Sequence, residues 1–112
     1  MAIYETMDEK NRLQAGTVVW AYAFQENSMK EGMLLSQKPV KGCIIHDSIY
    51  SNMFAPFKKN KEPELALSKA INVYGRNFAD TEEEAKEGYN QLIEKRIEWY
   101  QNKISLLKDA KL

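Results

Sequence analysis

From residue 81 to about residue 110, apolar residues recur in steps of mostly three and four. This spacing places them on one face of a helix rather than along a strand. Thr81 followed by Glu84 matches a capping box, and acidic residues in the first turn suit the positive end of the helix dipole. The pattern therefore predicts one long amphipathic helix whose apolar face packs against another surface. Its apolar positions are Ala85, Tyr89, Leu92, Ile93, Ile97, Tyr100, Ile104 and Leu107.

The length of this helix is informative. About 28 residues at roughly 1.5 Å each give a rod of ~42 Å, whereas a compact chain of this size is only ~34 Å across. We expect the first half, Ala85 to Ile97, to cover the protein's own sheet. The second half needs cover from the N-terminal segment, a second protomer or a target protein. Its candidate interface residues are Trp99, Tyr100, Ile104 and Leu107.

Before the helix, the pattern changes to short alternating runs. Residues 17–25 place Val18, Trp20, Tyr22 and Phe24 on one side, which predicts a strand with an aromatic face. Residues 26–32 read as a hairpin loop. Residues 33–37 predict a second strand, which Pro39 is expected to break.

Three further strands are predicted after this break. Residues 40–47 form the third, with Gly42 as a candidate bulge. Residues 48–59 hold the fourth, with Pro56 near its end, and a polar loop follows. Residues 66–76 suggest a fifth strand, although this segment could also begin as a helical turn.

The order of these elements predicts an α+β fold. We expect a small five-stranded antiparallel bent sheet or SH3-like barrel, followed by one long C-terminal helix. An open sheet with the helix across one face is the alternative. A single domain is expected over residues 1–112, with an N-terminal segment (1–15), a β-rich part (16–79) and the helix (80–110).

The N-terminal segment could contain a short helix. Thr6 and Glu9 match a second capping box, and Ile3, Met7 and Leu13 could face inward.

Composition and charge narrow the function. Lys and Arg total 16, Asp and Glu total 16, and 44% of the residues are hydrophobic. The zero net charge argues against a strongly basic nucleic-acid binder. Cys43 is the single cysteine, which suits a reducing compartment. No apolar run is long enough to span a membrane, and the N-terminus does not resemble a signal peptide. We therefore expect a soluble cytoplasmic protein.

Catalytic chemistry has little support in the sequence. His46 is the single histidine, and on a strand it points away from Cys43 because the offset is odd. A strand-end histidine bonded locally or to water is the favoured interpretation. The glutamates of the helix are expected to face solvent. No phosphate loop, nucleophile elbow or zinc motif occurs, so we expect no enzyme activity, no cofactor and no metal.

One basic cluster suggests a different function. Lys58, Lys59 and Lys61 share a loop next to Phe54 and Phe57, a combination that single-stranded nucleic acid can use. A nucleic-acid-binding barrel is therefore the alternative, with candidate contacts at Lys58, Lys59, Lys61, Lys69 and Arg76.

The segment "YGRNFADTEEEAKEGYNQLIEKRIEWYQNKI", preceded by "GMLLSQKPVKG" and "FAPFKKNKE", resembles a group of small accessory proteins of T-even-type bacteriophages. The resemblance covers roughly residues 17–104 and brings no catalytic residues with it. It implies a phage accessory protein made in the host cytoplasm, which binds host or phage machinery. The leading hypothesis is thus a non-enzymatic protein-binding factor that inhibits or redirects a host protein, with a homodimer through the C-terminal helix as another use of the same face.

Overall fold

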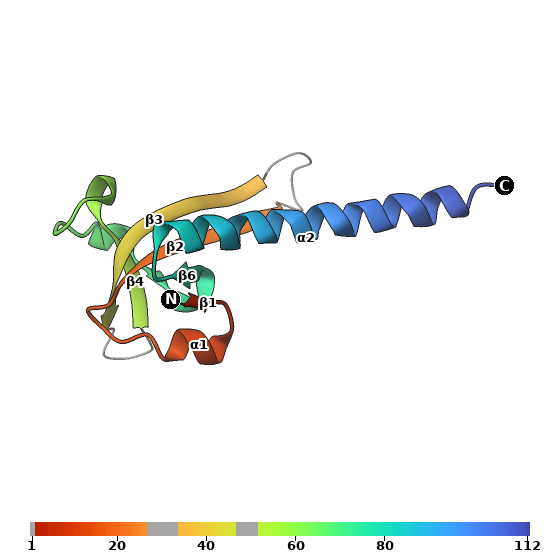
Figure 1. Ribbon diagram of the computed structural model, residues 1–112. Helices are drawn as coiled ribbons and strands as arrows, with labels where there is room; N and C mark the ends of the chain where they lie inside the picture. Colours follow the sequence, from red (N-terminus) through yellow and green to blue (C-terminus); the bar gives the residue numbers. More distant parts are fainter. Residues whose placement is uncertain (1, 27–33, 47–51) are drawn as a thin grey trace.

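The computed structural model describes residues 2–26, 34–46 and 52–112, and it has the expected α+β fold (Figure 1). An antiparallel sheet is followed by a single long helix, α2, at Glu82–Asp109. The expected hairpin loop and the start of the expected fourth strand lie largely outside the described residues.

Six strands form the sheet, rather than the five expected. Their order is β1-β6-β2-β3-β4-β5, and every described pair is antiparallel. Because this order is linear, with β1 and β5 at the two edges, the sheet is open and is not a closed SH3-like barrel. The strands are β1 (Ile3–Tyr4), β2 (Val18–Glu26), β3 (Leu34–His46), β4 (Asn52–Pro56), β5 (Ile71–Asn72) and β6 (Asn77–Ala79).

The expected break at Pro39 is wrong, since β3 continues through it. Ala21 pairs with Val40 and Ala23 pairs with Gln37, so β3 carries one residue more than β2 between these two pairs. This extra residue is a bulge, where a proline can be placed without losing a ladder hydrogen bond.

The expected bulge at Gly42 is also wrong. Gly42 pairs regularly with Val19 on one side and with Pro56 on the other. A Cβ atom here would overlap the ring of Phe54 and the carbonyl oxygen of Ala55. The glycine is needed because the Phe54 side chain lies directly over the backbone.

The segment expected as a fifth strand is mostly turn. Only Ile71–Asn72 pairs as β5, between two 3₁₀ turns, η2 (Leu67–Lys69) and η3 (Val73–Gly75). The alternative of an initial helical turn is therefore confirmed at η2. A further 3₁₀ turn, η1 (Lys58–Asn60), lies in the polar loop.

The N-terminal segment contains both a strand and a short helix, α1 (Met7–Asn11). The capping box is confirmed: the Glu9 amide donates to the Thr6 hydroxyl, and the Thr6 amide donates to the Glu9 carboxylate at 2.9 Å. These bonds to Thr6 hold the pKa of Glu9 below its usual value. Leu13 is buried as expected, but the inward position expected for Met7 is wrong because Met7 is 64% exposed.

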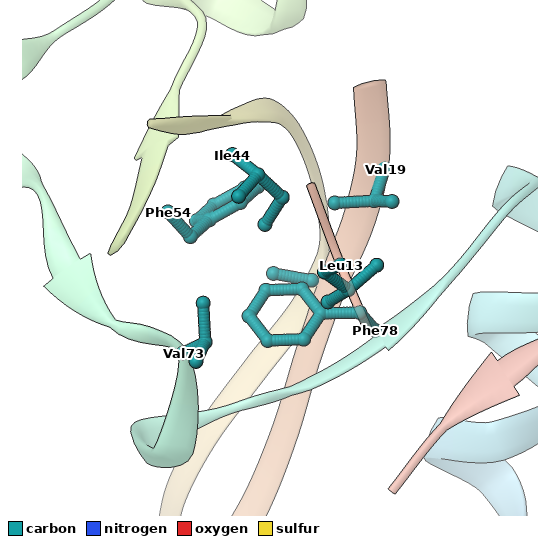
Figure 2. Packing of buried hydrophobic residues seen from close by; sticks show 7 residues of the cluster. Leu13, Val19, Ile44, Phe54, Val73 and Phe78 are labelled. Atoms are coloured by element: carbon teal, nitrogen blue, oxygen red, sulfur yellow. The ribbon is translucent and has the colours of Figure 1, made fainter. Parts of the chain in front are cut away.

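Both faces of the sheet are covered. On one face, the main core joins β2, β3, β4 and β6 to Leu13 and to Val73 of η3, as Figure 2 shows. On the other face, Tyr22 and Ala79 pack against Ala85 of α2. The alternation along β2 explains this division, because Val19 and Ala21 point into the main core while Trp20 and Tyr22 point toward the helix.

The molecule is elongated, with principal extents of 60 × 30 × 28 Å. Figure 1 shows the reason: α2 runs along the β2–β3 hairpin and then continues past the sheet to the C-terminus. The expectation that this helix is longer than the domain beneath it is confirmed.

Candidate functional site

Helix α2 begins where the sequence indicates. The Glu84 amide donates to the Thr81 hydroxyl at 3.2 Å, as in a capping box. The Glu84 carboxylate accepts from that same hydroxyl at 2.8 Å. Only Asp80 and Thr81 separate the end of β6 from Glu82, the first helical residue, so α2 starts directly beside the sheet.

The first half of α2 is packed on the sheet. Ala85 and Gly88 are buried, and Tyr89 and Leu92 are half-buried against the cluster around Tyr22. The Tyr89 ring meets the Phe24 ring edge-on, with centroids 6.4 Å apart. The aromatic face predicted for β2 is therefore the surface that receives the helix.

Gly88 allows the helix to approach this closely. A Cβ atom at position 88 would overlap the hydroxyl and ring of Tyr22. The close approach of the Tyr22 side chain therefore explains why a glycine is needed at this position.

The Tyr22 side chain is fully buried beneath the helix. Its hydroxyl has no hydrogen-bond partner among the described residues. Burial raises the pKa of this phenol well above its usual value, and the carboxylates of Glu5 and Glu9 raise it further. The packed half of α2 therefore rests on a phenol that must stay neutral.

We call residues 97–109 of α2 the overhang. Every residue in it is exposed. Ile97 is 42% exposed, so the covered half ends before Ile97, earlier than expected. The expected interface residues also lie in the overhang, with exposed fractions of 41% for Trp99, 44% for Tyr100, 50% for Ile104 and 70% for Leu107.

Two cations accompany the aromatic residues of the overhang. The Arg96 guanidinium lies 4.1 Å from the Trp99 ring centroid and 5.0 Å from that of Tyr100. The Lys103 ammonium lies 4.3 Å from the Trp99 ring, and the two rings meet edge-on at 5.0 Å. We call Arg96, Trp99, Tyr100 and Lys103 the aromatic–cation cluster.

Helical spacing in the sequence predicted the two rings of this cluster but not its two cations. The signal was present, since Arg96 and Lys103 stand three residues before and four residues after Trp99. Side chains at these spacings are neighbours on a helix surface. Each cation–π contact at an exposed site contributes about 0.5–1 kcal/mol.

The segment that contains η1 and η2, green in Figure 1, lies at the end of the molecule away from the C-terminus. These two turns border an open pocket of about 830 Å³. Lys58, Lys59, Lys69 and Arg76 all line it, together with apolar side chains such as Leu65 and Leu67. Four of the five residues expected to contact nucleic acid therefore lie around one hollow, and Lys61 is not among its lining residues.

Other details of this pocket fit nucleic acid less well. Phe54 and Phe57 are 1% and 7% exposed, so their rings cannot stack on bases. The Lys58 ammonium lies 3.9 Å from the Glu64 carboxylate, which partly offsets its charge. Base stacking on these two rings is therefore excluded.

His46 lies at the exposed end of β3, where Nδ1 is 3.4 Å from the Asn52 side-chain oxygen. Cys43 is a free, half-buried thiol that donates to the Ile44 carbonyl. The local bonding expected for His46 is confirmed. No group of three or more His, Cys, Asp or Glu side chains that could hold a metal occurs in the described part of the chain.

Among the described residues, no helix combines the length and apolar character needed to cross a membrane. Comparison of the chain with known protein families, with curated proteins and with solved structures finds no match. The overhang and the basic pocket are therefore the two surfaces whose geometry bears on function.

Proposed function

We propose that this protein is a non-enzymatic binding factor whose overhang contacts another protein. The observation that carries the proposal is the exposure of large apolar side chains along the overhang. An apolar face of this size costs free energy in water, and such faces typically mark interaction sites. Trp, Tyr and Arg are also the residues that most often dominate the binding energy of interfaces.

The aromatic–cation cluster adds a second reason. Arg96 precedes Trp99 along the helix and Lys103 follows it. Both cations contact the Trp99 ring. These contacts restrict the Trp99 side chain before a partner arrives. Less side-chain entropy is then lost on binding, which increases affinity.

The resemblance to accessory proteins of T-even-type phages supports a partner of the bacterial host. On this proposal the protein is made in the host cytoplasm and inhibits or redirects a host protein, as a takeover or counter-defence factor. The contact residues would be Trp99, Tyr100, Ile104 and Leu107.

The proposal can be tested by affinity capture of the tagged, full-length protein from a bacterial host lysate, followed by mass spectrometry. The wild type is compared with Trp99→Ala and with a control, Leu67→Ala, which removes a leucine that is 62% exposed and lies in the basic pocket instead. We expect a host protein that the wild type and the control retain and that Trp99→Ala loses. Equal recovery by all three proteins would contradict the proposal.

A second function, nucleic-acid binding, is favoured by one observation: Lys58, Lys59, Lys69 and Arg76 surround the same pocket. Phosphate groups could be neutralised there without base stacking. This function predicts salt-dependent binding of single-stranded DNA or RNA. The slope of the logarithm of the binding constant against the logarithm of the salt concentration should decrease in magnitude by about one unit for each phosphate contact that is removed. The absence of any binding at low salt would eliminate it.

A further inference from the structure

From the half-buried Ile93 into the overhang, α2 carries a pattern more specific than general amphipathicity. Ile93, Ile97, Tyr100, Ile104 and Leu107 follow one another in steps of four, three, four and three. This is the a/d repeat of a coiled coil, with Ile97 and Ile104 at a and the other three at d. We call these five residues the seam.

The seam does not point toward the sheet. At about 100° per residue, its mean direction is rotated by about 90° from that of Ala85, Gly88, Tyr89 and Leu92, the residues packed on the sheet. From Ile97 onward the seam is 42–70% exposed. A second helix can therefore lie along the seam while the sheet keeps its own cover.

The seam pairs well with a second copy of itself in the antiparallel direction. Ile97 then faces Leu107 of the partner subunit, and Tyr100 faces the partner subunit's Ile104, so every layer combines an a residue with a d residue. Ile93 faces the partner's Lys111, whose aliphatic stem can cover it while the ammonium reaches water. The overlap from Ile93 to Leu107 is about 21 Å long.

The charges beside the seam favour the same direction. At the e positions, Glu94 faces the partner's Lys108, and this pair of opposite charges occurs twice by symmetry. Gln101 faces its own copy at the centre, where two amides can bond to each other. Glu94, Ile97 and Gln101 line one shallow hollow of the helix surface, so these e positions lie beside the seam.

A parallel pairing is less favourable. It would place Lys103 at g opposite the partner's Lys108 at e, and this like-charge contact would also occur twice. In the antiparallel pairing Lys103 meets only its own copy, once. Its ammonium is drawn toward the Trp99 ring, 4.3 Å away, and so away from that contact.

From this register and these charges we infer that the partner of the seam is a second copy of this chain, joined as an antiparallel two-helix coiled coil. The inference rests on the proposed function of the overhang as a protein interface and names one of its partners. In this dimer Tyr100, Ile104 and Leu107 contact the second copy in place of a host protein. Trp99, at a c position outside the seam, remains exposed for a further protein.

The mass of the full chain in solution tests the dimer. Sedimentation equilibrium of the wild type over about 1–200 μM is expected to show a rise from 13.0 kDa toward twice that mass. The contact is short, so we expect a Kd in the micromolar range. Ile104→Asp, which places a charge in the seam, should stay monomeric. The matched control Leu106→Asp, 69% exposed and outside the seam, should dimerise as the wild type does.

Charge reversal tests whether the two helices of the dimer are antiparallel or parallel. Lys108→Glu places like charges opposite each other twice and should weaken the antiparallel dimer about tenfold at low salt. The double variant Glu94→Lys with Lys108→Glu should restore wild-type affinity. In a parallel dimer Lys108→Glu would strengthen association instead. Strengthening, or a failure of the double variant to restore affinity, would overturn the antiparallel assignment.

The two proposals fail in different ways. A chain that remains monomeric at every concentration overturns the dimer, even if Trp99→Ala still abolishes capture of a host protein. A chain that dimerises as described, but for which Trp99→Ala changes no captured protein, supports the dimer and removes the host target.

Discussion

In the first half of α2, Ala85 and Gly88 are buried against the sheet, whereas in the overhang Ile104 and Leu107 are 50% and 70% exposed. Both halves belong to one unbroken helix of 28 residues with apolar residues throughout. The difference arises because the sheet ends before the helix does. An apolar stripe therefore shows where a helix needs cover, and the dimensions of the rest of the fold decide whether the same chain supplies it.

Replacing a leucine by alanine in each half of α2 should give the largest difference in the free energy of unfolding. Leu92→Ala removes a half-buried side chain packed near Tyr22 and Ala79, and it should lower the free energy of unfolding by about 2 kcal/mol. Leu106→Ala, in the overhang, should change it by no more than about 0.5 kcal/mol. Urea denaturation at low protein concentration measures both values. Similar losses for the two variants would show that the overhang is part of the core.

The next largest difference in stability between the two halves of α2 should come from a substitution to alanine in each half. Gly88→Ala places a Cβ atom against the Tyr22 ring and hydroxyl. Overpacking typically costs 1–3 kcal/mol, and the better helix propensity of alanine returns only about 1 kcal/mol. We therefore expect a net loss of about 1–2 kcal/mol in thermal or urea denaturation.

Ser105→Ala is the control for this change, because Ser105 lies in the overhang and is exposed. Alanine has the higher helix propensity, so this variant should gain a few tenths of a kcal/mol. A gain for Gly88→Ala as well would mean that α2 is not held against Tyr22.

The buried phenol makes the packed half sensitive to alkaline pH. Burial raises the pKa of Tyr22 in the folded state, so above the unfolded pKa of about 10 the folded state binds more protons than the unfolded state. Stability is therefore complete below about pH 10 and decreases as the pH rises. By pH 11, ionisation of Tyr22 in the unfolded state alone should have lowered the free energy of unfolding by about 1.4 kcal/mol relative to neutral pH.

Denaturation of the wild type and of Tyr22→Phe across this pH range checks the assignment. The variant should lose most of the pH dependence. Tyr4, whose pKa is raised by partial burial and by its hydrogen bond to Asp80, should account for part of the remainder. An unchanged slope in Tyr22→Phe would mean that solvent reaches this hydroxyl.

The smallest effects should come from the two ends of α2. Thr81→Ala removes the hydroxyl that caps the helix beside the sheet and should cost about 1 kcal/mol. Ala110→Gly changes the cap of the overhang, where only local fraying depends on it, and should cost no more than a few tenths of a kcal/mol. Equal effects on global unfolding would show that the overhang unfolds together with the domain.

The sequence predicted α2 almost to the residue, because capping and helical periodicity are local properties. It missed β1 and β6, since strands of two or three residues carry no periodicity and exist only through pairing with distant partners such as Trp20 and Ala21. It also ended a strand at Pro39, because the bulge that accepts this proline depends on the register with β2.

The candidate functional residues show the same distinction between local sequence patterns and contacts between distant segments. Trp99, Tyr100, Ile104 and Leu107 could be named from helical spacing and a length estimate. The gathering of Lys58, Lys59, Lys69 and Arg76 around one pocket could not be derived, because it depends on how η1 and η2 fold back onto the edge of the sheet. The burial of Phe57, which excludes base stacking on its ring, could not be derived from the sequence either.

Hydrogen–deuterium exchange along α2, measured as a function of protein concentration, tests the difference between the two halves most directly. A helical end that projects alone into water should fray and exchange quickly, whereas a helix packed on a sheet should not. We expect the amides of residues 85–96 to be protected equally at every concentration. Protection of residues 97–109 should be low in the dilute protein and rise over the range in which the mass doubles. Strong protection of both halves, independent of concentration, would contradict the account.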